Sequence, residues 1–478
     1  MNELPRGWTW ASVGGLAADR GITDGPFGSN LKTAHYTDAG PRVIRLQNVG
    51  DGIFRDERAH IAQDHFESLL KHSVQPGDVL VASLGEVLPR SCQAPADLGP
   101  AIVKADVIRI HPGEAIHGAY LMWALNSPAT RDRVANAIKG VGRPRFNLGG
   151  LRALPLPLAP LPEQERIVAA IEEAFSLLDA GEAGLHATRS RLKRMRDSVL
   201  TAAVTGSLVP QDPSDTPAAY WLAKRDVTPT AQPECTVPPG WTYVPLARIA
   251  GVKLGRQRSP GRATGPRMRP YLRAANVGWS GLKLSDVKEM DFTESESRAF
   301  ELIPGDLLLS EASGSPGEVG KPAQFRGEIA NCCFQNTLIR VRLGHGLNTD
   351  FYEHYFRQQA LSGKFAEGSR GVGIHHLGQQ ALSEWVVPVP PPGEQVRIVA
   401  EVERQFSFID ACERAVDAAL VRSGALRRSV LKAAFEGRLV EQDPSDEPAA
   451  ALLERIRSER TSAPGKAPRR GRAKVEAS

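Results

Sequence analysis

Two short strings contain residue types that could do chemistry. The string "GSPGEVGKP" (314–322) resembles a phosphate-binding loop. The spacing of that motif, however, puts Ser315 where a glycine is required and Pro322 where the magnesium-binding hydroxyl is required. The adjacent His375 and His376 would suit a metal ion, but no carboxylate or thiol lies nearby at ligand spacing. We therefore expect neither a nucleotide site nor a metal site at these strings.

Other catalytic signatures are also missing from the sequence. The sequence has no glycine fingerprint for a methyl donor at a strand-to-helix turn and no "NPPY" string of adenine methylases. Asp78 and Asp306 follow Pro-Gly at the start of apolar runs, where an aspartate is typical of a turn. The prediction is a non-catalytic chain without a metal or cofactor of its own.

Composition bounds the kind of protein. A chain of 478 residues suggests roughly two to four domains, and no apolar run approaches the roughly 20 residues of a membrane span. The start, "MNELPRGWTW", lacks a secretory pattern, and the five cysteines include no C-x-x-C pair, so the reducing cytoplasm is the expected location. The net charge of +5, with arginine in excess over lysine, modestly favours binding to nucleic acid.

A long internal repeat is the most informative feature. The string "EQERIVAAIEEA" (163–174) returns as "EQVRIVAEVERQ" (394–405), and the match runs without gaps from "GVG" to "DPSD". Weaker echoes, such as "RGWTW" (6–10) with "PGWTY" (239–243), lie at similar offsets, so each half is one whole duplicated unit.

The strongly repeated segment predicts a long helix in each half. Proline-rich entries and acids precede it, glycines (Gly206 and Gly437) end it, and apolar residues recur every seven positions, as in a coiled coil. About 40 residues would make a rod of about 60 Å. Two ordinary amphipathic helices, each packed on its own domain, are the alternative. We expect the two helices to pair antiparallel through Ile171, Leu178, Leu185, Leu192, Val199, Val402, Ile409, Val416, Leu426 and Val430.

The remaining parts contain short β-prone runs cut by Gly, Pro, Asn and Asp, each followed by a helical stretch (118–138 and 349–368). This pattern predicts an α+β protein: two α/β domains separated by two long antiparallel coiled-coil helices, with a pseudo-two-fold internal repeat. The expected boundaries are a first domain at 1–155, a central spacer helix at 156–210, a short helix and linker at 211–239, a second domain at 240–386, a distal spacer helix at 387–440, and a C-terminal helix with a basic tail at 441–478.

In this order the motifs resemble the specificity subunit of type I restriction-modification systems. The resemblance is carried by "GPFGSNLKTAHYTDAGPRVIRLQNV" (25–49), "PGDVLVAS" (76–83), "RPRFNLGGLRALPLPLAPLPEQERIV" (143–168) and "LGQQALSEWVVPVPPPGEQVRIV" (377–399), and the duplicated plan covers nearly the whole chain. The resemblance implies two target-recognition domains, each reading one half of a bipartite, asymmetric sequence in double-stranded DNA. The second domain departs from the pattern, because its arginine-rich opening (251–277) lacks the "PFGSNLK" wording.

The resemblance also implies partners. Two methyltransferase (modification) subunits would dock on the helices, motor-nuclease (restriction) subunits would join for cleavage, and S-adenosylmethionine, ATP and Mg would belong to those partners. Two other classes of protein stay open: a coiled-coil adaptor whose domains grip proteins, and a fused methylase-nuclease, which the missing motifs disfavour.

Polar loop residues are the candidates for reading DNA, because arginine and lysine suit guanine or phosphate while asparagine and glutamine suit adenine. For any one of them a solvated loop side chain is an equally good interpretation. The candidates are Ser29, Asn30, Lys32, Arg45, Gln47, Asn48, Arg90, Ser91, Lys139, Arg143, Arg145 and Asn147 in the first domain, and Lys253, Arg256, Gln257, Arg258, Arg273, Asn276, Lys321, Arg370, His375 and His376 in the second.

Overall fold

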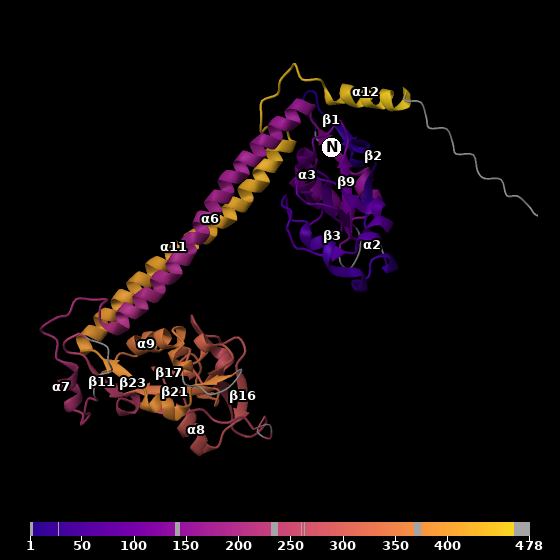
Figure 1. Cartoon of the computed structure of the whole chain (residues 1–478). Coiled ribbons are helices and arrows are strands. Elements are labelled where there is room, and N and C mark those ends of the chain that lie inside the picture. The colour runs from indigo at the N-terminus through magenta and orange to yellow at the C-terminus, as the bar shows by residue number, and fades with distance from the viewer. Residues whose placement is uncertain are drawn as a thin grey trace, which may run out of the picture. The chain divides into compact units, whose positions relative to one another are not determined.

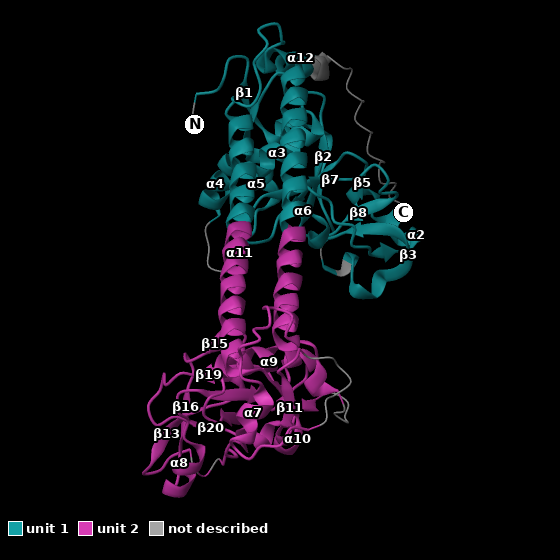
Figure 2. Ribbon diagram, turned by 90° about the vertical axis from the view of Figure 1, so that its left-hand side faces the viewer, with its two compact units in different colours: residues 1–185, 418–478 teal, residues 186–417 magenta. Residues whose placement is uncertain are grey.

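The computed structural model divides into two compact units (Figure 2). Unit 1 consists of residues 1–185 and 418–478, and unit 2 consists of residues 186–417. Two long helices, α6 (Leu161–Thr205) and α11 (Pro392–Phe435), each contribute one part to each unit. The structure describes residues 3–26, 28–138, 144–230, 238–259, 261, 263–367 and 374–462.

The globular domain of unit 1 contains two four-stranded sheets. Their strand orders are β2-β9-β6-β7 and β4-β3-β8-β5, and only β3 and β8 run parallel. A separate pair, β1 and β10, leads into α6. The strands are β1 (Thr9–Ser12), β2 (Ala17–Asp24), β3 (Tyr36–Ile44), β4 (His60–Ile61), β5 (Ser73–Val74), β6 (Val79–Ala82), β7 (Arg90–Gln93), β8 (Ala101–Val103), β9 (Val107–Pro112) and β10 (Pro155–Leu158). The helices are α1 (Val13–Leu16), α2 (Gln63–Ser68), α3 (Gly118–Asn126), α4 (Pro128–Ala137), α5 (Leu148–Ala153) and α12 (Ala449–Ser462).

The globular domain of unit 2 repeats this plan although its sequence has diverged. Its main sheet has the order β12-β21-β17-β19, a second sheet has the order β16-β13-β20, and β11 pairs with β23. The strands are β11 (Thr242–Pro245), β12 (Ala250–Leu254), β13 (Met268–Leu272), β14 (Val277–Gly278), β15 (Gly281–Leu282), β16 (Lys288–Asp291), β17 (Asp306–Ser310), β18 (Ala312–Ser313), β19 (Pro322–Phe325), β20 (Cys333–Phe334), β21 (Leu338–Leu343), β22 (His375–His376) and β23 (Val386–Val389). The helices are α7 (Ala218–Ala223), α8 (Glu294–Phe300), α9 (Thr349–Leu361) and α10 (Gln379–Glu384).

Matching contacts confirm that the two domains share one fold. Tyr120 and Tyr352 are both fully buried, and each donates its hydroxyl to the carbonyl of a proline in the strand before the long helix. Asp78 and Asp306 are also buried, and each accepts a hydrogen bond from the backbone N–H three residues earlier. The interpretation of these aspartates as turn residues is therefore confirmed.

The long helices begin and end where the sequence predicted. α6 contains Pro162 in its first turn and α11 begins at Pro392, a position where the missing N–H costs nothing. Gly206 and Gly437, with φ of +73° and +67°, follow the last turns and provide the left-handed conformation that ends a helix.

The repeated Glu-Gln pair at the start of each helix is buried. In unit 1 the carboxylate of Glu163 accepts the indole N–H of Trp8, and burial raises the pKa of Glu163. The amide of Gln164 accepts from the His117 N–H at 2.8 Å and donates to the Ala159 carbonyl at 2.9 Å. The pair therefore joins the helix to its domain, a role that the sequence pattern did not reveal.

The start of each long helix is also bound by an ion pair to the loop that follows the other long helix. In unit 1 Arg166 of α6 pairs with Asp446, which follows α11, at 2.7 Å. In unit 2 Arg397 of α11 pairs with Asp215, which follows α6, at 2.6 Å. The repeated "DPSD" string therefore follows one long helix and binds the first turns of the other.

Helices α6 and α11 run antiparallel within each unit (Figure 1), as their side-chain contacts also show. In unit 1 Arg427 of α11 binds Asp179 and Glu182 of α6, and its guanidinium lies 5.0 Å from the centre of the Phe175 ring. Ser423, one turn earlier on α11, donates to Glu182 at 2.6 Å. Residue numbers along α11 decrease as the numbers of their contact residues along α6 increase. The predicted antiparallel direction is therefore confirmed.

Unit 2 contains the same arginine cluster with the helices exchanged. Arg196 of α6 binds Asp410 and Glu413 of α11 and lies 4.7 Å from the centre of the Phe406 ring. Each of these residues stands 231 positions from its counterpart in unit 1. Within each unit, the arginine and its two acids favour one relative shift of the two helix segments.

Removing one arginine should loosen only its own unit. We expect Arg427→Ala to lower the free energy of unfolding by about 1–2 kcal/mol, because partly exposed charged hydrogen bonds and one cation–π contact are lost. Urea unfolding of the full chain measures this change. The neighbouring exposed Arg428 offers a control, since Arg428→Ala should change stability by less than about 0.5 kcal/mol; equal effects of the two variants would contradict this role for the cluster.

The predicted pairing residues differ in burial. Ile171, Leu192 and Val199 on α6, and Val402, Ile409 and Val416 on α11, are buried, while Leu178, Leu185 and Val430 are half-buried. Leu426 is the exception, because its side chain is 53% exposed. The seam position is occupied instead by the small, buried Ser423, which leaves Leu426 on the flank of the pair.

We expect His354 to make unit 2 sensitive to acid. It lies on α9 against Phe406, with ring centres 5.9 Å apart, and burial followed by the nearby Arg357 lowers its pKa to about 4. The equivalent residue in unit 1, two positions after the matching tyrosine, is Met122.

The variant His354→Met tests this. Between pH 6.5 and about 4 the unfolded chain binds a proton that folded His354 refuses, so stability falls as the pH falls through this window. We expect the variant to remove up to about 3 kcal/mol of this loss. Unfolding free energies at pH 7 and pH 4.5 give the comparison, and an unchanged difference between these two pH values would contradict the assignment.

Candidate nucleic-acid interface

Four loops of the globular domain in unit 1 lie side by side. The N–H of Lys104, after β8, donates to the Ile44 carbonyl at the end of β3 at 2.8 Å. The Ser83 N–H after β6 donates to the Asp106 carbonyl at 2.9 Å, and the Phe146 N–H donates back to Ser83 at 2.8 Å. Residues that are far apart in the sequence are therefore held side by side.

The second domain holds the corresponding loops in the same way. The Gln335 N–H donates to the Leu272 carbonyl at 2.9 Å, and the Glu311 N–H donates to the Thr337 carbonyl at 3.0 Å. Leu377 completes the set by donating to Glu311 at 2.8 Å. Each domain therefore has the same set of backbone hydrogen bonds between equivalent loops, which we call its loop framework.

In each domain a glycine allows the loop after the first strand of the main sheet to pack directly against these interacting loops. A Cβ on Gly25 would lie 2.1 Å from the carbonyl carbon of Lys104, and a Cβ on Gly255 would lie 2.1 Å from the carbonyl oxygen of Gln335. Both glycines follow the last residue of their strands, β2 and β12. No other residue type fits so close to a neighbouring main chain.

Several predicted residues of the first domain lie on this framework. Gln47 is exposed and Arg45 is half-buried on the loop after β3. Arg90 is oriented by the carbonyls of Val49 and Leu46, at 2.7 and 3.3 Å. Arg145 is partly exposed and pairs with Asp106 at 2.6 Å. These four side chains form the candidate surface of domain 1.

Four predicted residues have structural roles instead. Asn48 and Asn276 are buried, and each accepts the N–H three residues earlier and donates to two carbonyls of its own loop. Ser91 is buried against Asn126. Arg256 is 8% exposed and pairs with Glu296 at 2.9 Å. Because these side chains are buried and bound within the protein, the structure gives them a role in shaping the loops, and it does not present them as free DNA contacts.

Glu296 is well suited to hold Arg256. Burial would raise the pKa of Glu296, but hydrogen bonds from Thr293 and Arg256 lower it to about 2. The carboxylate therefore stays charged at any physiological pH.

Other predicted residues lie outside the loop framework or contact other residues of the protein. Asn30 and Lys32 are exposed beside α2, where His65 contacts the Asn30 carbonyl, and Asn147 caps α5. Lys253 lies over the Phe300 ring, and Lys321 pairs with Glu318. Lys139, Arg143, Arg370 and the side chain of Ser29 lie outside the described residues.

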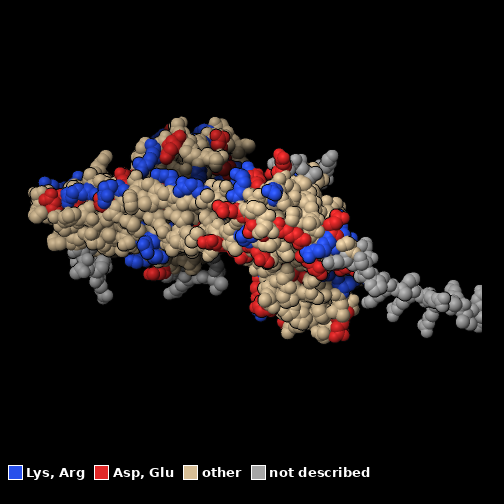
Figure 3. Space-filling model, turned by 90° about the horizontal axis from the view of Figure 1, so that it is seen from above, with Lys and Arg blue, Asp and Glu red and all other residues tan. Residues whose placement is uncertain are grey.

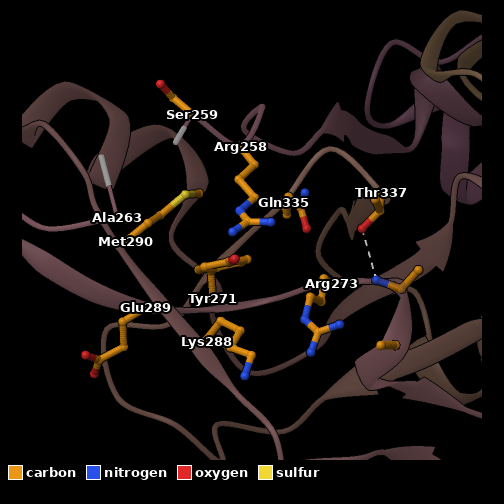
Figure 4. A pocket seen from close by; sticks show the side chains of 12 residues that line it. Arg258, Ser259, Ala263, Tyr271, Arg273, Lys288, Glu289, Met290, Gln335 and Thr337 are labelled. Carbon is orange, nitrogen blue, oxygen red and sulfur yellow. Dashed lines mark hydrogen bonds between the residues drawn. The ribbon is translucent and has the colours of Figure 1, made fainter. Parts of the chain in front are cut away.

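A cavity of about 550 Å³ opens beside the framework of the second domain (Figure 4). Of the predicted residues, Arg258 and Arg273 line it, and Arg273 pairs with Asp286 at 2.6 Å. The other predicted side chains near this framework are the exposed Gln257, His376 bound to Glu311 at 3.1 Å, and the half-buried His375.

The sequence prediction missed six polar lining residues: Ser259, Tyr271, Lys288, Glu289, Gln335 and Thr337. Tyr271 and Lys288 lie on paired strands and Gln335 follows β20, so only the pairing of strands distant in sequence brings them together. The similar strings "RLQNV" (45–49) and "RAANV" (273–277) mark this loop in the sequence, but no such string marks the strands beside it.

Charge is spread rather than gathered on the face drawn in Figure 3, where basic side chains lie in small groups among acidic ones. The residues that the structure describes include no group of three or more His, Cys, Asp or Glu side chains placed to hold a metal ion. Likewise, no helix in the described ranges has the length and apolarity needed to cross a membrane.

The fold and the candidate site define a class of protein in which two duplicated α+β domains, with the same loops and different side chains, are carried by antiparallel helices. Known proteins of this class are similar over nearly the whole chain. The chain is 25% identical to the EcoKI type I restriction enzyme specificity subunit of Escherichia coli (strain K12), covering 97% of this chain and 98% of that protein. It is 24% identical to the StySPI specificity subunit of Salmonella potsdam, with the same coverage.

Solved structures agree on the fold. A chain from a study of complex assembly and conformational transition of the type I R-M system matches with a TM-score of 0.65 and 19% identity, over 92% of this chain and 100% of that one. The HsdS subunit from Thermoanaerobacter tengcongensis matches with a TM-score of 0.55 and 19% identity, over 91% and 98%. No protein-family model matches the sequence. These similarities confirm the resemblance to type I specificity subunits that the motifs indicated.

Proposed function

We propose that the chain is the DNA-recognition subunit of a type I restriction-modification complex, with each recognition domain reading one half of a bipartite, asymmetric target. One observation carries the proposal: the two domains hold the same loops with the same backbone contacts but present different side chains. A shared framework suits the common shape of duplex DNA, and different side chains suit two different half-sequences. The long helices would set the spacing between the halves.

The chain would have no catalytic role alone. Methylation of adenine and ATP-dependent cleavage would belong to modification and restriction subunits, which would also hold S-adenosylmethionine, ATP and Mg. We place the assembled complex in the cytoplasm, where its DNA is found.

Exposed apolar side chains on the helices support the docking of two methyltransferase subunits. In unit 1 Leu177 and Leu426 are 71% and 53% exposed, and in unit 2 Phe408 and Met195 are 59% and 40% exposed. Leu177 corresponds to Phe408 and Met195 to Leu426, each 231 positions apart. The chain therefore carries the same apolar pair once in each unit, as two copies of one partner would require.

Both members of each pair lie on one flank of the helices. Leu177 comes one residue before the seam residue Leu178, and Leu426 comes three residues after Ser423; at 100° per residue these positions differ by only about 40° around a helix. Phe175, which packs edge-on against Trp123 of the recognition domain, lies on the opposite flank. The apolar pair of unit 1 is thus turned away from its own domain and open to a partner.

Mapping methylated adenines in the genome of cells with and without this chain tests the proposal. The expected result is one two-part motif with a fixed gap that is methylated only when the chain is present. A complex that assembles fully but methylates without sequence preference, or leaves the DNA unmodified, would favour the protein-adaptor alternative.

A further inference from the structure

The cavity of the second recognition domain contains two polar side chains that are not engaged by the protein. Arg258 is exposed at the rim and Gln335 is half-buried in the wall. Within the described part of the chain, neither side chain makes an ion pair or hydrogen bond. By contrast, Arg273 and Lys288 in the same cavity share the carboxylate of Asp286, at 2.6 and 2.7 Å.

Backbone contacts position the two segments that carry these side chains. Gln335 is fixed through its own N–H, and the backbone of Arg256, two residues before Arg258, pairs with it as a parallel bridge. The close approach of Gly255 to the Gln335 carbonyl keeps these segments together. In Figure 4 the Arg258 guanidinium extends over the cavity toward Tyr271, with Gln335 beside it.

Comparison with the first domain separates shared residues from specific ones. Arg273 corresponds to Arg45, so both domains have an arginine at this point of the loop. Arg258, the third residue after Gly255, corresponds to Gly28, and Gln335 corresponds to Lys104. Contacts to the DNA backbone are the same for any sequence and suit shared positions, whereas contacts to base edges suit positions that differ.

We propose that Arg258 and Gln335 determine the specificity of the second domain, with Arg258 reading a guanine and Gln335 an adenine at neighbouring base pairs of the second half-target. This rests on the proposed function. An arginine fork matches the two acceptors of guanine in the major groove, and a glutamine amide matches the donor and acceptor of adenine. Two free groups held in one cavity reach adjacent bases without any change of the framework.

The test uses the full chain assembled with its methyltransferase subunits and maps methylated adenines for Arg258→Ala and Gln335→Ala. In each variant, one base pair of the second half-motif should lose its preference, by about 5- to 150-fold, while the first half-motif stays unchanged. The two variants should relax different positions. Arg248→Ala is the matched control, because this exposed arginine of the same domain lies outside the cavity.

Three results decide the question. An unchanged motif in both variants overturns the inference. A uniform loss of methylation with the same base preference also overturns it, since that is the behaviour of phosphate contacts. If the unaltered chain directs no two-part motif, the proposed function fails instead, so the two failures can be told apart.

Discussion

Gly255→Ala should abolish discrimination in the second half of the target while leaving the first half intact. The added Cβ would lie 2.1 Å from the Gln335 carbonyl oxygen and 2.8 Å from the Phe334 ring, and the nearest of these atoms belongs to main chain that cannot rotate away. The loop bearing Arg258 must therefore separate from the strand end bearing Gln335. We expect DNA carrying the correct second half to bind more than tenfold more weakly, which corresponds to at least about 1.4 kcal/mol.

Two companion variants make this result specific. Gly25→Ala introduces the same clash in the first domain and should impair only the first half of the target. Gly251→Ala, on β12 of the second domain, meets its nearest atom at 3.9 Å and should bind like the unaltered chain. Binding is measured on duplexes in which one half-target at a time is randomised. Equal loss on both halves from Gly255→Ala would contradict the independence of the two domains.

Charging one apolar pair should remove one methyltransferase subunit from the complex. The double variant Leu177→Asp, Leu426→Asp should lower the ratio of methyltransferase to recognition subunits from two to one, and Phe408→Asp with Met195→Asp should do the same. Each large apolar side chain buried in an interface stabilises it by about 1.5–3 kcal/mol, so losing two weakens docking by at least about a hundredfold. A buried carboxylate adds to this penalty.

The mass of the assembled complex in solution measures this ratio. Val421→Asp is the control, because Val421 is 73% exposed on α11 but its counterpart in the repeat is the polar Ser190. That variant should keep two subunits. If both double variants fold and still carry two subunits, the apolar pairs do not serve docking.

Periodicity and turn chemistry were enough to predict the long helices, because proline, glycine and a seven-residue repeat act locally. The direction of pairing was also predictable, since two matching seams favour a two-fold arrangement. Local patterns could not show the arginine clusters around Phe175 and Phe406, because these clusters join positions more than 200 residues apart. The buried Glu-Gln pairs were hidden for the same reason: an acid in the first turn of a helix has a sufficient local explanation.

The candidate interface was predicted less completely than the fold. Selecting polar loop residues found Arg258, Arg273 and Gln47, but residue type does not distinguish a side chain that faces outward from one that binds its own loop. Asn48 and Asn276 were therefore included although they are buried. Gln335 and Tyr271 were missed because strand pairing, rather than a polar loop string, brings them to the cavity.

The make-up of unit 1 has a consequence during synthesis on the ribosome. Its core includes Leu431, Phe435 and Leu452, which are translated more than 230 residues after Leu185, the end of the unit's first segment. At a translation rate of about 5–20 residues per second, the C-terminal segment that completes the core of unit 1 is made roughly 10–50 s after the first segment. Unit 2 is continuous in sequence and meets no such delay. The part of the protein made first is therefore finished last, and in the interval its apolar surface is exposed to chaperones and to other nascent chains.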